Sequence, residues 1–139
     1  MRLLLKTAFI LCLLGSQVFA EGDADAGKKA YNKCKSCHSI VDNDGNVILK
    51  GAKTGPNLYG LAGRIAASVD GFKYGKSIKA LGETGFAWSE ADFISYVADP
   101  TKFLRATLDD SKAKSKMSYK LKKEKDAQDI WAFLVSVSE

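Results

Sequence analysis

One short stretch of the sequence, Cys34-Lys35-Ser36-Cys37-His38, combines the side chains best suited to holding a metal cofactor. His38 is the only histidine of the 139 residues, and two of the three cysteines lie within the four residues before it. C-x-x-C-H is the attachment signature of c-type haem, in which two thiols form thioethers with the porphyrin and the imidazole binds the iron. Cysteines three residues apart project from the same side of a helical turn, so both reach one macrocycle. The stretch therefore predicts one covalent haem c anchored by Cys34 and Cys37, with His38 as an iron ligand.

Two other uses of a C-x-x-C pair fit the neighbouring sequence less well. A tetrahedral zinc site needs four protein ligands, and the chain has no second C-x-x-C pair and no other histidine. A thioredoxin-type dithiol needs a strand that leads into the motif. Here Asp23 instead predicts the start of a helix that runs to Tyr31. Haem attachment is the interpretation that these neighbours favour.

The first 20 residues have the features of a secretory signal peptide. Arg2 and Lys6 precede an apolar stretch at 7–14, and Val18-Phe19-Ala20 follows with the spacing of a cleavage site. The apolar stretch is shorter than the roughly 20 residues that a membrane-spanning helix needs, which disfavours the alternative of a retained anchor. We therefore predict cleavage after Ala20, a single domain at 21–139 and a periplasmic location.

Six motifs follow one another along the chain in the order typical of class I c-type cytochromes. They are C-K-S-C-H at 34–38, K-T-G-P-N-L-Y-G-L-A-G-R at 53–64, F-A-W at 86–88, Y-V-A-D-P at 96–100, K-M-S-Y-K-L-K-K at 116–123 and D-I-W-A-F-L at 129–134. The chain most closely resembles the bacterial cytochrome c2 group, and the resemblance covers nearly all of residues 21–139. It implies a soluble periplasmic carrier of single electrons, with one haem, rather than an enzyme.

Met117 is the only methionine that remains after the predicted cleavage. It lies in a polar, basic stretch at 113–120, where a methionine that fills a gap in a core would be out of place. In the family, the methionine of the K-M pair is the second axial ligand of the iron. Ligation by imidazole and thioether favours reduced iron and leaves no open position, which suits a carrier. The alternative is a haem enzyme or a ligand-binding sensor with an open sixth iron site.

The resemblance assigns further residues to the haem pocket. The carbonyl of Pro56 would accept a hydrogen bond from His38 and so orient its ring. The hydroxyl of Tyr96 would approach the sulfur of Met117. The haem propionates would be held by Arg64, Tyr74 and Trp88. The alternative roles are packing in the core for Trp88 and Tyr96, and a solvated charge for Arg64.

The predicted fold class is all-α, with helices and glycine-rich loops wrapped around one haem. Nine of the twelve glycines lie between Gly45 and Gly85, which predicts loops there with at most one short helix at about 73–81. Val47-Ile48-Leu49 follows Asp44-Gly45 and is predicted to form one arm of a small hairpin. Residues 109–114 make the segment before Met117 longer than in the short mitochondrial form, and its course is not predicted.

Three helices are predicted outside this loop-rich region. The first runs from Asp23 to Tyr31, and Ser89 begins a capping box for a second that Asp99-Pro100 should end. The third spans about 123–137, with its apolar residues on one face. The family resemblance also implies that the first helix packs closely on the last, through Gly27 and Tyr31 near Ile130 and Phe133.

Basic residues gather near the predicted methionine ligand, which suggests an acidic partner. Residues 101–125 hold nine basic and three acidic side chains, a net charge of +6 (9 − 3). The net charge of the whole chain is +5. The lysines predicted to form the docking rim are Lys35, Lys53, Lys116, Lys120, Lys122 and Lys123. Such a rim speeds association with an acidic surface, and the effect weakens as salt rises. By resemblance, the donor is a cytochrome bc1-type complex and the acceptor a photosynthetic reaction centre or a terminal oxidase.

Other uses of the positive charge have less support in the sequence. A face of lysines that only contact solvent is the simplest alternative to a docking rim. Nucleic acid is not an expected partner, because no nucleic-acid-binding motif occurs and the chain carries the export signal described above. We expect the protein to act as a monomer.

Overall fold

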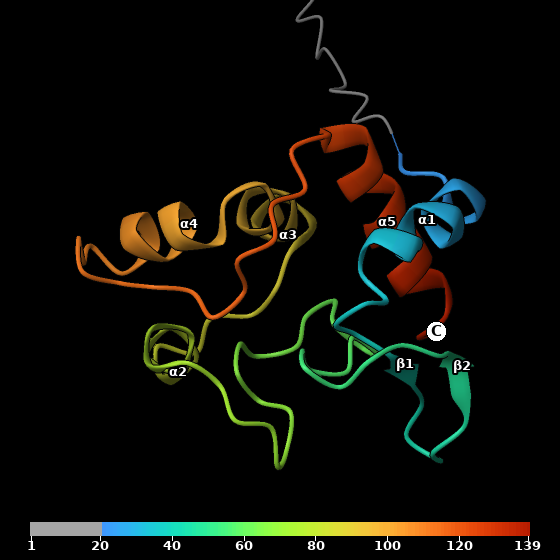
Figure 1. The fold of residues 1–139 in the computed structure, drawn as a ribbon, viewed down its shortest axis with the longest axis horizontal. Coiled ribbons are helices and arrows are strands. Elements are labelled where there is room, and N and C mark those ends of the chain that lie inside the picture. The colour runs from blue at the N-terminus through green and yellow to red at the C-terminus, as the bar shows by residue number, and fades with distance from the viewer. Residues whose placement is uncertain (1–20) are drawn as a thin grey trace, which may run out of the picture.

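A computed structural model describes residues 21–139, so the predicted signal peptide at 1–20 lies outside the described residues. The elements are α1 (Ala24–Ala30), the 3-10 helix η1 (Tyr31–Lys33), β1 (Ile40–Val41), β2 (Val47–Leu49), α2 (Lys76–Glu83), α3 (Glu90–Ala98), α4 (Pro100–Thr107) and α5 (Glu124–Ser136). In Figure 1, α1 crosses α5 on one side of the molecule, and α2, α3 and α4 form the other side. Long loops join the two sides, and helices with one two-stranded hairpin make up the described elements. Within the described part, no helix is long and apolar enough to cross a bilayer.

The helix starts predicted from capping residues are confirmed. The Asp23 carboxylate accepts hydrogen bonds from the N–H groups of Asp25 and Ala26, which have no partner inside the helix. Ser89 caps α3 by accepting a hydrogen bond from the Asp92 N–H at 3.2 Å. The last helix begins within one residue of its predicted start at 123.

The glycine-rich middle also follows the prediction, with one shift. β1 and β2 pair antiparallel as a two-stranded hairpin, so Val47–Leu49 is the predicted arm. The short helix expected at 73–81 begins three residues later, at Lys76, and ends at Glu83. Tyr74 and Gly75 remain extended or turned before it, which leaves Tyr74 free to face the interior of the molecule.

α4 is a helix that was not predicted. Asp99-Pro100 does end α3, at Ala98, but the same two residues also begin α4. The Asp99 side chain accepts the N–H of Lys102 at 3.0 Å, and Pro100 stands at the first helical position, where its missing N–H costs nothing. A proline that stops one helix therefore starts the next.

The contact between α1 and α5 joins the two ends of the domain. A Cβ atom on Gly27 would overlap the carbonyl oxygen of Asp129, so only glycine allows the two backbones to lie this close. The Tyr31 ring meets the edge of Phe133 with centroids 5.9 Å apart. The carboxylate of Asp129 also accepts the Asp23 N–H at 2.7 Å. This crossing holds the segment that precedes Cys34 against the core.

Candidate haem site

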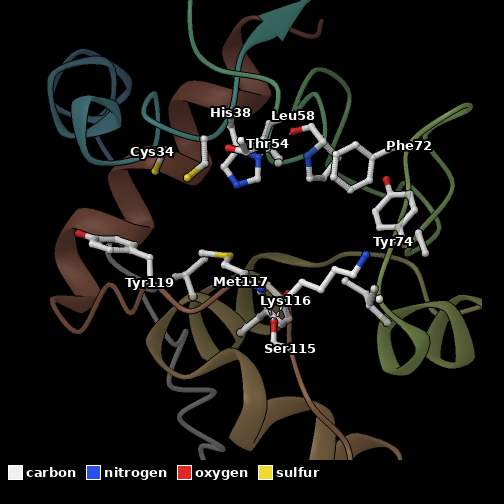
Figure 2. A pocket seen from close by; sticks show the side chains of 18 of the residues that line it. Cys34, His38, Thr54, Leu58, Phe72, Tyr74, Ser115, Lys116, Met117 and Tyr119 are labelled. Carbon is white, nitrogen blue, oxygen red and sulfur yellow. Dashed lines mark hydrogen bonds between the residues drawn. The ribbon is translucent and has the colours of Figure 1, made fainter.

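A cavity of about 390 Å³ lies between the two sides of the molecule. It is lined on one side by residues that follow η1 and on the other by α3 and the segment at 114–119. Figure 2 shows the His38 ring and the Met117 thioether on opposite sides of this cavity, both pointing into it. Two residues that are 79 positions apart in the chain are thus opposed, as two axial ligands of one metal must be.

The C-x-x-C-H stretch is wound into a tight turn at the edge of the cavity. The N–H groups of Cys37 and His38 both donate to the carbonyl of Cys34, at 3.0 and 2.9 Å. This turn brings both cysteines to the cavity lining, with Cys34 half-buried and Cys37 exposed, and neither is in a disulfide. Both thiols are therefore available to the same group that His38 faces.

The orientation of the His38 ring is set by the loop at 54–56. Nδ1 lies 2.7 Å from the carbonyl oxygen of Pro56, and because a carbonyl only accepts, Nδ1 must carry the proton. Burial, partly opposed by this hydrogen bond, lowers the pKa of His38. The ring therefore stays neutral, with the lone pair of Nε2 available to a metal. A Cβ atom on Gly55 would lie 2.6 Å from Nδ1, so the glycine makes room for the ring.

Ser115 is a site residue that sequence reasoning missed. Its hydroxyl oxygen accepts the Met117 N–H at 3.1 Å and lies 3.3 Å from the hydroxyl of Tyr96. The partner of the Tyr96 hydroxyl is thus Ser115, two residues before the methionine whose sulfur it was expected to approach. Burial raises the pKa of Tyr96, so the phenol keeps its proton. The only sequence signal for this contact is a serine two positions before a candidate ligand. That signal is too common to single out Ser115.

Three predicted propionate-binding residues line the cavity with hydrogen-bond donors to spare. Arg64 donates to the carbonyl of Tyr59 at 2.8 Å and has no acidic partner among residues 21–139. The hydroxyl oxygen of Tyr74 accepts the Val69 N–H at 3.2 Å, which leaves its own proton free. Trp88 is 7% exposed and also lines the cavity. A half-buried guanidinium that lacks a carboxylate partner fits a cofactor that brings carboxylates of its own.

The rest of the lining is largely apolar and was not predicted from the sequence. It includes Leu58, Leu61, Phe72, Ile78, Phe93 and Val97. The Trp88 ring packs edge-on against Tyr96, with centroids 5.1 Å apart. Phe103, which does not line the cavity, stacks on Trp88 from behind. An apolar wall of this kind suits the flat face of a porphyrin and keeps water away from it.

The structure also bears on the two alternative uses of the C-x-x-C pair. Burial, with a smaller contribution from Cys37, raises the pKa of the Cys34 thiol to about 11. A redox-active dithiol needs the opposite, a lowered pKa that exposes a thiolate. In the described part of the chain, no three Cys, His, Asp or Glu side chains are grouped to hold a metal ion among themselves. The raised pKa of Cys34 therefore disfavours a redox-active dithiol.

Known proteins are similar to this chain over nearly its whole length. Cytochrome c-551 of Roseobacter denitrificans is 54% identical over 134 residues, covering 96% of this chain and 94% of that protein. Cytochrome c2 of Rhodobacter capsulatus is 52% identical over 138 residues, covering 99% and 98%. No protein-family model matches the chain. The chain belongs to the cytochrome c2 family.

Solved structures agree with this assignment. The cytochrome c2 structure from Rhodobacter capsulatus superposes with a TM-score of 0.82 at 55% identity, covering 85% of this chain and all of that one. Ferric cytochrome c-550 from Paracoccus versutus gives a TM-score of 0.80 at 51% identity, covering 86% and 100%. The predicted fold class, family and cofactor are confirmed: this cytochrome carries one covalent haem c and is an electron carrier rather than an enzyme.

The lysines predicted to dock a partner divide into two groups in this cytochrome. Lys35, Lys53 and Lys122 are exposed and form no ion pair with a described residue. The other three have partners within the chain: Lys116 with the carbonyl of Lys73, Lys120 with Asp99, and Lys123 with Asp126. The first group is free to meet another protein, whereas the second would have to exchange its present contacts.

Proposed function

We propose that this cytochrome carries electrons through a haem attached to Cys34 and Cys37 and ligated by His38 and Met117. The observation that supports this most directly is the opposed placement of His38 and Met117 across a cavity that both cysteines line. When bound, the haem supplies an iron that changes between two oxidation states by one electron. The protein has to hold that group still and keep water from it.

Each pocket residue has a task that follows from its contacts. The Pro56 carbonyl holds the proton on Nδ1 of His38, so that Nε2 is offered to the iron in a fixed direction. Ser115 holds the backbone N–H of Met117 and so places the thioether. The spare donors of Arg64, Tyr74 and Trp88 would meet the negative haem propionates, which relieves the cost of a half-buried arginine charge.

Export is the second part of the proposal. We propose that residues 1–20 are removed and that residues 21–139 form the mature periplasmic domain. A mature domain shorter than the full chain is supported by the solved cytochrome c2 structure, whose whole length matches 85% of this chain.

Intact-mass spectrometry of the purified protein tests both parts at once. The expected mass is that of residues 21–139 plus one haem, with the added mass on the peptide that contains Cys34 and Cys37. Cys34→Ala and Cys37→Ala should each leave a single thioether, and the double variant should leave none. A mass without haem would contradict the attachment, and a mass that includes residues 1–20 would contradict the cleavage.

For its partners, we propose a bc1-type complex as donor and a reaction centre or terminal oxidase as acceptor, with the cytochrome docking as a monomer. The three unpaired lysines of the rim, Lys35, Lys53 and Lys122, would meet an acidic surface first. Steering by such charges raises association rates by about 10-fold to 1,000-fold.

Replacing these three lysines together by glutamine is expected to slow association with a purified bc1-type complex about tenfold at low salt. The effect should shrink at high salt, because screening already removes most of the attraction in the unsubstituted protein. Stopped-flow reduction measured over a series of salt concentrations checks this. Lys28→Gln is the matched control, because Lys28 lies on α1 and does not line the cavity. An equal effect of the control would refute a specific rim.

A further inference from the structure

The segment between α4 and α5, residues 108–123, carries Met117 and contains no helix or strand. A loop of this length has many accessible conformations, and each one that moves the sulfur away from the iron competes with ligation. Figure 1 shows that the segment doubles back beneath α4 and passes α3 before it enters α5. The contacts of this segment with α4 are therefore the ones to examine.

The upstream half of the segment is fastened to the C-terminal end of α4. Nε of Arg105 donates to the carbonyl oxygen of Ala113 at 3.1 Å, and the carbonyl of Arg105 accepts the Asp110 N–H at 3.1 Å. Ala113 is only 1% exposed, so this turn of the loop also has an apolar anchor. The extra length at 109–114 is thus tied to the helix through Asp110 and Ala113, and Ala113 is its one buried residue.

The part nearest the methionine is fastened to the N-terminal end of the same helix. The Ser115 N–H donates to the hydroxyl of Thr101 at 3.3 Å, two residues before Met117. Nζ of Lys120 lies 2.6 Å from the Asp99 carboxylate, three residues after Met117. Anchors on one helix therefore lie on both sides of the methionine along the chain.

We propose that α4 is a clamp that keeps Met117 on the iron, with Arg105 and Lys120 as its positioning residues. The inference rests on the proposed ligation by Met117. α4 can serve in this way because it packs on α3, whose Tyr96 lines the same cavity. The position of α4 is therefore fixed relative to the cavity wall. Both anchoring side chains are charged, and hydrogen bonds to charged groups hold more strongly than neutral ones.

The test uses the oxidised holoprotein and the variants Arg105→Gln, Lys120→Gln and Lys102→Gln. Lys102 is the matched control, because it is exposed on α4, carries the same charge and forms no side-chain hydrogen bond or ion pair with a described residue. Lys120→Gln leaves the Asp99 cap of α4 intact, which Asp99→Asn would not. The first measurement is the rate at which added imidazole displaces the sulfur, followed by loss of the sulfur-to-iron absorption band. The second is hydrogen exchange of the amides from 113 to 120, and the third is global melting followed by circular dichroism.

Loss of either anchor is expected to raise the displacement rate and the amide exchange rates about five- to tenfold, with little change for Lys102→Gln. Arg105→Lys keeps a donor and should recover part of the difference. If the absorption band is present but Arg105→Gln and Lys120→Gln behave like Lys102→Gln, the clamp is wrong while the ligation stands. If the rise in displacement rate is no larger than the loss of global stability in the melting curves accounts for, the anchors only stabilise the fold and the clamp is again wrong. If the unsubstituted protein lacks the band, the ligation fails and the clamp fails with it.

Discussion

Replacing Met117 by leucine is expected to abolish the sulfur-to-iron absorption band and to lower the reduction potential by on the order of a hundred millivolts. Leucine is close to methionine in volume, so the segment should still fold and the haem should still be attached through Cys34 and Cys37. The thioether is what favours reduced iron. No other thioether side chain is available, because the only other methionine, Met1, lies in the predicted signal peptide. Optical spectra and redox titration of the purified variant check this result.

The same variant tests whether Met117 closes the sixth iron position. Without the thioether the sixth iron position opens, so added imidazole or cyanide should bind much faster than to the unsubstituted protein. Ser118→Ala is a suitable control, since Ser118 is the exposed neighbour of the ligand. An unchanged spectrum in Met117→Leu would refute the assignment of Met117 as the sixth ligand of the iron.

Replacing Gly27 by alanine is expected to destabilise the protein by about 2–3 kcal/mol, although alanine is the better helix former. Propensity alone would stabilise α1 by about 1 kcal/mol. In the structure, however, the new Cβ atom would overlap the carbonyl oxygen of Asp129 and lie 2.9 Å from Cβ of Phe133. A backbone carbonyl cannot rotate away as a flexible side chain does, so α1 and α5 would have to separate, and the steric cost outweighs the gain in propensity.

Denaturant unfolding of the holoprotein measures this difference. Lys28→Ala provides the control, because it places alanine at the next position of α1, where the side chain is exposed. The control should leave stability nearly unchanged. A Gly27→Ala protein as stable as the control would show that the crossing of α1 and α5 tolerates more space than the structure indicates.

Which elements could be predicted depended on how local their causes are. α1 and α3 begin where Asp23 and Ser89 satisfy N–H groups two or three residues away, so the sequence pattern was sufficient. α4 was missed because Asp99-Pro100 was interpreted only as a stop. The same pair also fits a helix start, and what stabilises α4 there is its packing on α3 and α2, with Leu104 almost fully buried.

The haem site shows the same division. Cys34, Cys37 and His38 are neighbours in the chain, and one turn closed by the Cys34 carbonyl sets their relative positions. Their chemistry could therefore be predicted from spacing alone, and Met117 followed from the scarcity of soft ligands and the family resemblance. Ser115 could not be found in this way, because its role depends on the position of Tyr96, 19 residues away.

The residue types and spacing of the chain thus predicted the cofactor, its two proposed anchors, one proposed ligand and the all-α class, since each depends on contacts within a few residues or on composition. Only the tertiary structure decided which groups meet across the cavity. It opposed Met117 to His38, paired Lys120 with Asp99 and seated the loop before Met117 on Arg105. These contacts join segments that are distant in sequence, and their geometry comes from the packing of helices around a shared core, which no local pattern encodes.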